Sequence, residues 1–330
     1  MSKLIDRHIS VLDSLRAFAA LSVCAFHFVC TTTGFITNEW ILKIFSAGQY
    51  GVHAFFVISG FVIPWSMYHA GFKIKNFFSF FLKRLSRLEP PYIFSLGIAL
   101  ILLYLRNRFY QTNSNDSQIN SVQIALHFGY LIPFFENYKW LNVVYWTLAV
   151  EFQYYLFIAL IFIPLIKSKL LVRIIIYVLI FALSFFSGKE FLLYWLPIFF
   201  LGILLFLKTV SLISLREYTC VMIFIICFSF YKYSPILVLY ALIPVFCVLC
   251  YKNIKIYFLD TVGKFSYSLY LIHTLIGATV VNVLSHNANS VFYKLLVILF
   301  GFAVSILSAW VVYLIIEKPS KKLSSSVKYK

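Results

Sequence analysis

The chain has 330 residues, of which 62% are hydrophobic, 20% aromatic and only 12% charged. A soluble domain carries about 25% charged and 45–50% apolar residues, so this composition, with a mean hydropathy of +0.91, excludes an ordinary soluble domain. Long apolar runs instead predict an all-α, polytopic membrane protein. The net charge of +17 does not indicate nucleic-acid binding, because the basic residues lie in short segments between apolar runs, where they act as topology signals beside anionic lipid.

The apolar runs predict about ten transmembrane helices. The first, residues 12–31, follows Lys3 and Arg7, but it is too long and too charged for a cleavable signal peptide. We therefore expect it to remain as the first membrane helix. The other predicted spans are residues 48–69, 91–105, 144–166, 171–187, 190–207, 218–231, 235–250, 265–284 and 293–316.

The distribution of basic residues predicts that both termini are cytoplasmic. With the N-terminus inside, 20 of the 28 Lys and Arg residues fall in cytoplasmic segments and seven fall in outer segments, while Arg16 lies within a span. Such an excess of positive charge on one side is typical of cytoplasmic loops. The polar end of the chain, residues 321–330, is then a solvated cytoplasmic tail.

Three connections have distinctive compositions. Residues 73–90, KIKNFFSFFLKRLSRLEP, predict an interfacial amphipathic helix, and Pro90 and Pro91 predict a break before the third span. Residues 106–123 are polar, which favours a solvated loop over part of a binding site. Residues 124–135 are apolar but too short to span, so they are either re-entrant or interfacial.

The first span carries three ionisable residues, Asp13, Arg16 and His27. An Asp or Arg at the centre of a membrane helix costs roughly 2.5–3.5 kcal/mol, so such residues indicate function. Arg16 and His27 are eleven residues apart, which places them on one face, ~16 Å apart along the axis. Arg16 then either binds an anion or only pairs with Asp13, one turn away.

His27 is the leading candidate for catalysis. A neutral imidazole takes a proton from a hydroxyl group that attacks a carbonyl, and burial in apolar surroundings favours the neutral form. The alternative is an interfacial histidine that hydrogen-bonds to a carbonyl near the end of the helix. The spacing alone favours neither.

Three further residues are candidates for a site. Arg84 and Arg87 lie one turn apart and suit a phosphate-rich ligand, although composition alone favours contact with lipid headgroups. Glu151 lies well inside an apolar run, where it is expected to orient His27, to hold a hydroxyl group or to pair with an arginine of another helix.

The remaining ionisable and thiol groups in apolar runs are expected to be structural. His53 and His273 are more typical of satisfied core residues than of site residues. The six cysteines lie in or beside apolar runs and form neither a disulfide framework nor a CxxC pair, so we expect inert thiols and no metal site.

Five motifs in order resemble the membrane-bound acyltransferase-3 family, which includes bacterial O-antigen and exopolysaccharide O-acetyltransferases. One departure is His53, where many members have an acidic residue after Gly-Val. The motifs span nearly the whole chain: LDSLRAFAALSVCAFHF with Arg16 and His27, GVHAFFVISGFVI at 51–63, RLSRLEPPY with Arg84 and Arg87, WTLAVEFQYY with Glu151, and FSYSLYLIHTLI at 265–276.

The resemblance implies a transmembrane acyltransferase domain over residues 1–320, in the short form without the hydrolase-like domain that some members carry. It implies transfer of acetyl from cytoplasmic acetyl-CoA to a membrane-associated glycan on the outer side of the bacterial inner membrane. His27 acts as the base or briefly carries the acetyl group, and Glu151 is the second candidate catalytic residue. The candidate substrate-binding residues are Asp13, Arg16, Arg84 and Arg87, with the donor phosphates near the arginines.

Lipopolysaccharide O-antigen is the expected acceptor, and exopolysaccharide or capsule is the alternative. No bound cofactor is expected, because acetyl-CoA is a substrate. Two other classes of function compete with the enzyme. A transporter or flippase for a glycan intermediate also places charges in membrane helices, but the two related halves typical of transporters are not found. A membrane-embedded binding or scaffold protein accounts less well for ionisable residues on one stripe.

Overall fold

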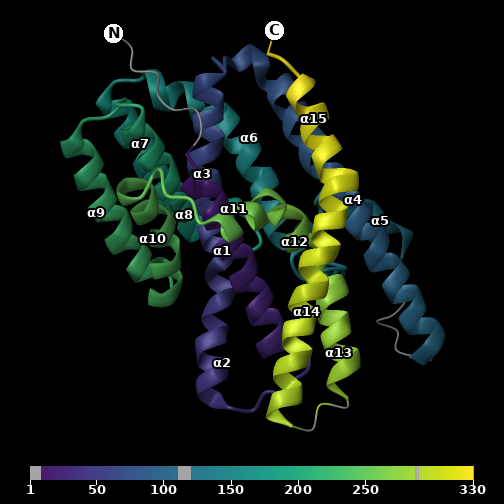
Figure 1. Cartoon of the computed structure of the whole chain (residues 1–330). Helices are drawn as coiled ribbons and strands as arrows, with labels where there is room; N and C mark the ends of the chain where they lie inside the picture. The colour runs from purple at the N-terminus through teal and green to yellow at the C-terminus, as the bar shows by residue number, and fades with distance from the viewer. Residues whose placement is uncertain (1–8, 111–119, 287, 289, 330) are drawn as a thin grey trace. The chain divides into compact units, whose positions relative to one another are not determined.

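The computed structural model describes residues 9–110, 120–286, 288 and 290–329, and this part of the chain contains helices and no strand (Figure 1). Lys3, Arg7, Lys330 and the middle of the 106–123 segment lie outside the described residues. The chain divides into two compact units. The first unit comprises Met1–His69 and Pro197–Tyr267, and the second comprises Ala70–Leu196 and Ser268–Lys330.

The first unit is built around α1, which contacts α3 and α11, while α3 also contacts α10. α3 and the part of α8 in this unit meet at two glycines: a methyl group at Gly60 would overlap the backbone of Phe199, and one at Gly202 would overlap that of Val57. The helices of this unit are α1 (Val11–Phe26), α2 (Glu39–Ser46), α3 (Gly51–His69), most of α8 (Leu192–Thr209), α9 (Leu215–Lys232), α10 (Pro235–Cys250) and α11 (Tyr257–Lys264).

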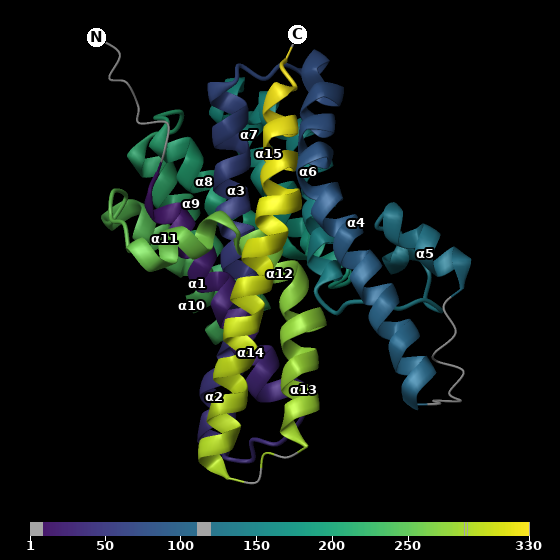
Figure 2. The same ribbon diagram turned by 45° about the vertical axis from the view of Figure 1, so that its right-hand side comes forward.

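The second unit pairs helices that are distant in sequence. α15 lies along α4, and α13 lies beside α14 in both views (Figures 1 and 2). The helices of this unit are α4 (Phe77–Tyr110), α5 (Ser121–Phe128), α6 (Tyr145–Lys167), α7 (Leu170–Leu183), most of α12 (Ser266–Ile272), α13 (Thr279–Ser285), α14 (Val291–Val312) and α15 (Lys318–Ser326).

Within the described residues, three helices contain a π-helical turn, at His27–Thr31, His273–Ala278 and Tyr313–Glu317. Such turns are rare and occur frequently at functional sites. Each of the three begins or ends at a histidine or a glutamate. Short 3₁₀ turns occupy Ala47–Tyr50, Ile74–Asn76, Ile132–Phe134 and Ser184–Phe186.

Seven helices of the described chain are long and apolar enough to cross a membrane. They coincide with seven of the predicted spans, and two further predicted spans match the shorter apolar helices Leu170–Phe186 and Pro235–Cys250. The number ten and the orientation of the termini therefore stay predictions. The seven are Val11–Thr31, Glu39–His69, Ile74–Phe109, Tyr145–Lys167, Leu192–Thr209, Ser266–Ser285 and Val291–Ser326.

The predicted break at Pro90 and Pro91 is wrong, because α4 continues through both prolines. Residues 77–90 are helical as predicted, but they are the first part of α4 and not a separate helix; their placement at the membrane interface stays a prediction. Each proline removes one helical hydrogen bond, but the next turn is held by tertiary contacts. Tyr92 is fully buried and donates to the carbonyl of His127 over 3.1 Å, and Ser95 Oγ lies 2.9 Å from the hydroxyl of Tyr145.

Residues 321–326 of the predicted tail are helical, because the last helix continues through Ser326. Most of these side chains are exposed, and a cytoplasmic location of the tail stays a prediction. Ser324 is buried and donates to the carbonyl of Lys83 on α4 over 2.6 Å. The ammonium group of Lys83 in turn lies over the ring of Tyr329. This end of the chain is thus packed on α4, and its polar composition did not indicate this packing.

Candidate functional site

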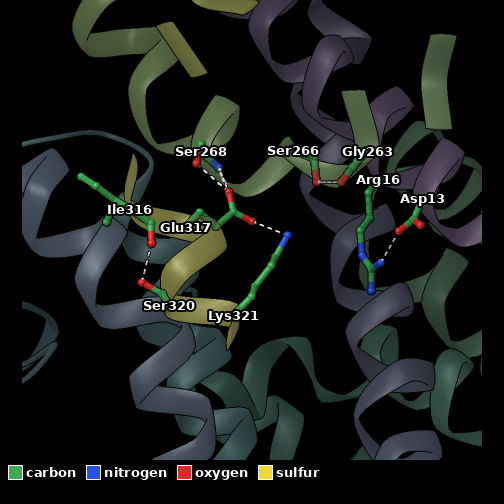
Figure 3. Close-up of polar contacts among 9 residues, drawn as sticks. All are labelled: Asp13, Arg16, Gly263, Ser266, Ser268, Ile316, Glu317, Ser320 and Lys321. Carbon is green, nitrogen blue, oxygen red and sulfur yellow. Dashed lines mark hydrogen bonds and ion pairs between the residues drawn. The ribbon is translucent and has the colours of Figure 1, made fainter. Parts of the chain in front are cut away.

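The charged residues of the first helix form an ion pair within one turn. Arg16 Nη1 donates to Asp13 Oδ1 over 2.9 Å, and both side chains are largely but not fully buried (Figure 3). The ion pair with Asp13, one of the two alternatives expected for Arg16, is therefore observed. The pair neutralises the cost of placing either charge in an apolar helix, and whether Arg16 also binds an anion stays a prediction.

α11 packs very closely on α1 beside this ion pair. A methyl group at Gly263 of α11 would overlap the carbonyl of Asp13, so only glycine permits this approach. Ser266 Oγ donates to the carbonyl of Gly263 over 2.9 Å (Figure 3) and closes the end of α11. The backbone that carries Asp13 is therefore held from a helix 250 residues later in the sequence.

His27 begins the π-helical turn in the same continuous helix as Arg16. Its carbonyl accepts from the backbone N–H of Thr32 over 3.0 Å and from the hydroxyl of Thr32 over 2.7 Å. Its ring Nδ1 lies 3.1 Å from Thr31 Oγ1, and the ring packs beside Phe26. The side chain is partly exposed.

Arg84 is buried on α4 and does not face lipid headgroups, contrary to the reading that composition favours. Its guanidinium group lies over two aromatic rings, 5.4 Å from the centre of Phe80 and 5.8 Å from that of Tyr155. Such cation–π contacts stabilise a guanidinium group away from water. Arg87, one turn later, is partly exposed.

Glu151 of α6 shares a cleft in the second unit with Arg84. The hydroxyl of Tyr155, one turn later on the same helix, donates to Glu151 Oε1 over 2.7 Å and so holds the carboxylate in place. The structure thus brings together two of the predicted site residues, while Arg87 is not among the lining residues. The cleft is lined by Arg84, Leu85, Leu88, Glu89, Tyr130, Leu148, Glu151, Phe152 and Tyr155.

A second carboxylate in this cleft, Glu89, was not predicted from the sequence. Glu89 Oε1 accepts from the hydroxyl of Tyr130 over 2.9 Å, and the ring of Tyr130 packs between Tyr92 and Phe152. Tyr130 has a positive φ of 54°, which is uncommon for a bulky residue and marks local strain. The signal in the sequence was the position of Glu89, two residues after Arg87, but the expected break at Pro90 hid it.

A buried carboxylate outside this cleft, Glu317, was also not predicted. It is 1% exposed and accepts from the backbone N–H of Ser268 over 3.2 Å and from the hydroxyl of Ser268 over 2.6 Å. Lys321 forms an ion pair with its other oxygen over 2.7 Å (Figure 3). This set is fully hydrogen-bonded and fastens the last helix to α12. Its signal was an acidic residue directly after the predicted span 293–316.

The two weaker histidines are core residues in the structure. His273 is fully buried, and its Nδ1 lies 2.9 Å from the carbonyl of Tyr270, to which it donates. His53 is buried on α3 between the rings of Tyr50 and Phe56. Both placements agree with the expectation that these residues are structural.

The predicted site residues belong to different units. Asp13, Arg16 and His27 lie in the first unit, and Arg84, Arg87 and Glu151 lie in the second. Each unit therefore presents its own chemistry: an imidazole on a helix in the first, and a guanidinium group with two carboxylates in the second. Among the residues that the structure describes, no group of His, Cys, Asp and Glu is arranged to hold a metal ion.

The chain matches a known protein family. A family model described as an acyltransferase domain matches residues 9–316, a range that includes every predicted site residue. A Staphylococcus aureus (strain COL) protein named "Putative O-acetyltransferase" is 29% identical over 168 residues, which is 49% of this chain and 26% of that protein. O-acetyltransferase OatA of S. aureus (strain NCTC 8325 / PS 47) is 27% identical over 162 residues, 47% of this chain and 25% of that protein.

The chain thus matches about a quarter of the length of these curated relatives. No solved structure matches the chain.

Proposed function

The chain belongs to the acyltransferase-3 family of membrane enzymes, and we propose that it transfers an acetyl group from acetyl-CoA to a hydroxyl group of a cell-surface polysaccharide. The observation that carries this proposal is the placement of His27 in an apolar helix of a chain that the family model covers from residue 9 to 316. The relatives are named O-acetyltransferases, which supports an acetyl group as the group transferred and a hydroxyl oxygen as the atom that receives it.

The proposed chemistry needs a base for the acceptor hydroxyl. His27 removes the hydroxyl proton while the oxygen attacks the thioester carbonyl. The C–S bond breaks, and the proton on the imidazole passes to the leaving thiolate, which yields an O-acetyl ester and CoA. In the alternative, His27 itself takes the acetyl group and then gives it to the hydroxyl.

The other predicted residues bind and orient. Arg84, Arg87 and Arg16 are proposed to bind the phosphates of acetyl-CoA, since guanidinium groups form paired hydrogen bonds with phosphate. Asp13 holds Arg16 through their ion pair. Glu151 is proposed to hold a hydroxyl group, which is supported by the hydrogen bond that its carboxylate already accepts from Tyr155.

The finer topology belongs to this proposal. We place the protein in the bacterial inner membrane with about ten spans and both termini in the cytoplasm, on the distribution of basic residues in its short loops. Acetyl-CoA then arrives from the cytoplasm, and the glycan acceptor lies on the outer side. Lipopolysaccharide O-antigen is the acceptor that we propose.

The test is structural analysis of the host's surface glycans with and without the gene for this chain. We expect one O-acetyl signal on O-antigen to disappear in the deletion strain and to return with the intact gene, but not with His27→Ala. Loss of an O-acetyl group from exopolysaccharide or capsule would instead identify that polysaccharide as the acceptor. An unchanged set of O-acetyl groups, with altered export of a glycan, would contradict an acetyltransferase and favour a transporter.

A further inference from the structure

Two neighbouring threonines contact His27 in different ways. Thr31 Oγ1 lies 3.1 Å from ring Nδ1 and 3.2 Å from the carbonyl oxygen of the same residue. Thr32 Oγ1 contacts the carbonyl at 2.7 Å, and no contact between Thr32 and the ring is found in the structure. The π-helical turn that begins at His27 brings both hydroxyl groups back to this residue.

The two contacts of Thr31 bear on which nitrogen of the imidazole carries the hydrogen. A carbonyl oxygen only accepts, so the contact at 3.2 Å is a hydrogen bond only when the Thr31 hydroxyl donates to it. That hydroxyl has a single hydrogen and then meets Nδ1 with a lone pair. Both contacts are hydrogen bonds at the same time only when Nδ1–H donates to Thr31 Oγ1.

We propose that Thr31 is a positioning residue that holds His27 as the Nδ1–H tautomer and so makes Nε2 the basic nitrogen. This inference rests on the proposed role of His27 as a base. In a neutral imidazole the nitrogen without hydrogen accepts the proton, and the partner of the other nitrogen decides which one that is. Thr31 supplies that partner from within the same helical turn.

The tautomer matters for the proposed reaction. Nε2 takes the proton of the acceptor hydroxyl as its oxygen forms the new C–O bond. The C–S bond of the thioester breaks, and Nε2–H then returns the proton to the thiolate. Nδ1–H keeps its hydrogen bond to Thr31 throughout, so the ring does not rotate between the two proton transfers.

The first arm of the test measures catalysis by the purified full-length protein. The assay follows transfer from [14C]acetyl-CoA into the glycan fraction extracted from host membranes, with His27→Ala as a parallel variant. Thr31→Val keeps the shape of the side chain and removes the hydroxyl. We expect it to lower kcat about five- to tenfold, the effect of one orienting hydrogen bond, with the KM for acetyl-CoA within twofold.

Two matched variants separate ring positioning from helix structure. Thr31→Ser restores the hydroxyl and is expected to recover most of kcat. Thr32→Val removes only a hydrogen bond to the carbonyl and is expected to keep kcat within twofold. An equal loss in Thr32→Val, or no recovery in Thr31→Ser, would overturn the proposal.

The second arm reads the tautomer directly from 15N chemical shifts of labelled histidine, with the His27 signals assigned by their loss in His27→Ala. We expect a protonated Nδ1 in the unmodified protein and a shift toward protonated Nε2 in Thr31→Val. A protonated Nε2 in the unmodified protein contradicts the inference. Full transfer activity in His27→Ala would instead contradict the proposed function, so the two failures are distinguishable.

Discussion

Tyr155 donates its hydroxyl hydrogen to Glu151 Oε1 over 2.7 Å, from one turn further along the same helix. A carboxylate inside an apolar helix needs such a partner, because a buried charge without hydrogen bonds is costly. The bond fixes one oxygen of Glu151 and directs the carboxylate into the cleft that Arg84 also lines.

Glu151→Gln is expected to lower acetyl transfer at least tenfold, since the amide cannot hold a hydroxyl group with the strength of a charged acceptor. Tyr155→Phe removes only the orienting bond and should cost about two- to tenfold. The measurement is transfer of labelled acetyl by purified protein. Glu190→Gln, at an exposed position, serves as the control, and normal transfer by Glu151→Gln would exclude Glu151 from the site.

Gly263→Ala is expected to destabilise the protein, because the added methyl group overlaps the carbonyl of Asp13 and forces α1 and α11 apart. Overpacking of this kind costs about 1–3 kcal/mol, measurable by thermal unfolding in detergent. Gly97→Ala is the control, since nothing lies within 4 Å of its added methyl group, and it should leave stability unchanged or raise it. Equal melting temperatures for the two variants would refute the close approach.

Glu317→Ala is expected to lower stability by about 2–4 kcal/mol, because the buried hydroxyl and N–H of Ser268 lose their acceptor and Lys321 loses its partner. In a protein of this size the melting temperature should fall by about 3–6 °C. Lys322→Ala, at an exposed position of the same helix, should have little effect. An unchanged melting temperature in Glu317→Ala would show that the cluster does not fasten the last helix.

The segment around His127 is expected to loosen as the pH falls. His127 is fully buried, donates through Nδ1 to the carbonyl of Gln123 and accepts at Nε2 from the N–H of Leu141. Burial lowers the pKa of His127 from its ordinary value of 6.5, while the bond to Gln123 opposes the shift. Below pH 6.5 the open form binds a proton that the closed form excludes, so stability is full above this pH and is lost as the pH falls.

Hydrogen exchange of the Leu141 amide measures this loss. Its protection, corrected for the intrinsic pH dependence of exchange, should fall between pH 7 and pH 5. The amide of Leu192 donates to the uncharged side-chain oxygen of Gln153 over 2.9 Å and should show no such change. Constant protection of Leu141 across this range would contradict a neutral, hydrogen-bonded His127.

The sequence predicted the helical class, the positions of the long apolar helices and the presence of Arg16 and His27 on one helix. These features depend on composition and spacing, which are local. The sequence did not predict that α4 continues through Pro90 and Pro91. The continuity depends on tertiary contacts of Tyr92 and Ser95, and such contacts override the local preference of proline.

The same limit explains the missed carboxylates. Glu89 was read as part of an interfacial segment, and its place in the cleft follows only from a continuous α4 and from the unusual backbone of Tyr130. Glu317 was not identified as a candidate, because no local pattern reveals Ser268 as its partner, 49 residues earlier. Burial of polar residues is set by such distant partners.

The most direct test of the account is acetyl transfer by purified, folded His27→Ala, with [14C]acetyl-CoA as donor and the host's membrane glycan as acceptor. Loss of a general base or of a covalent carrier predicts a rate at least 100-fold below that of the unmodified protein, with an unchanged melting temperature. Transfer at the normal rate by the folded variant would contradict the assignment of His27 as the catalytic residue.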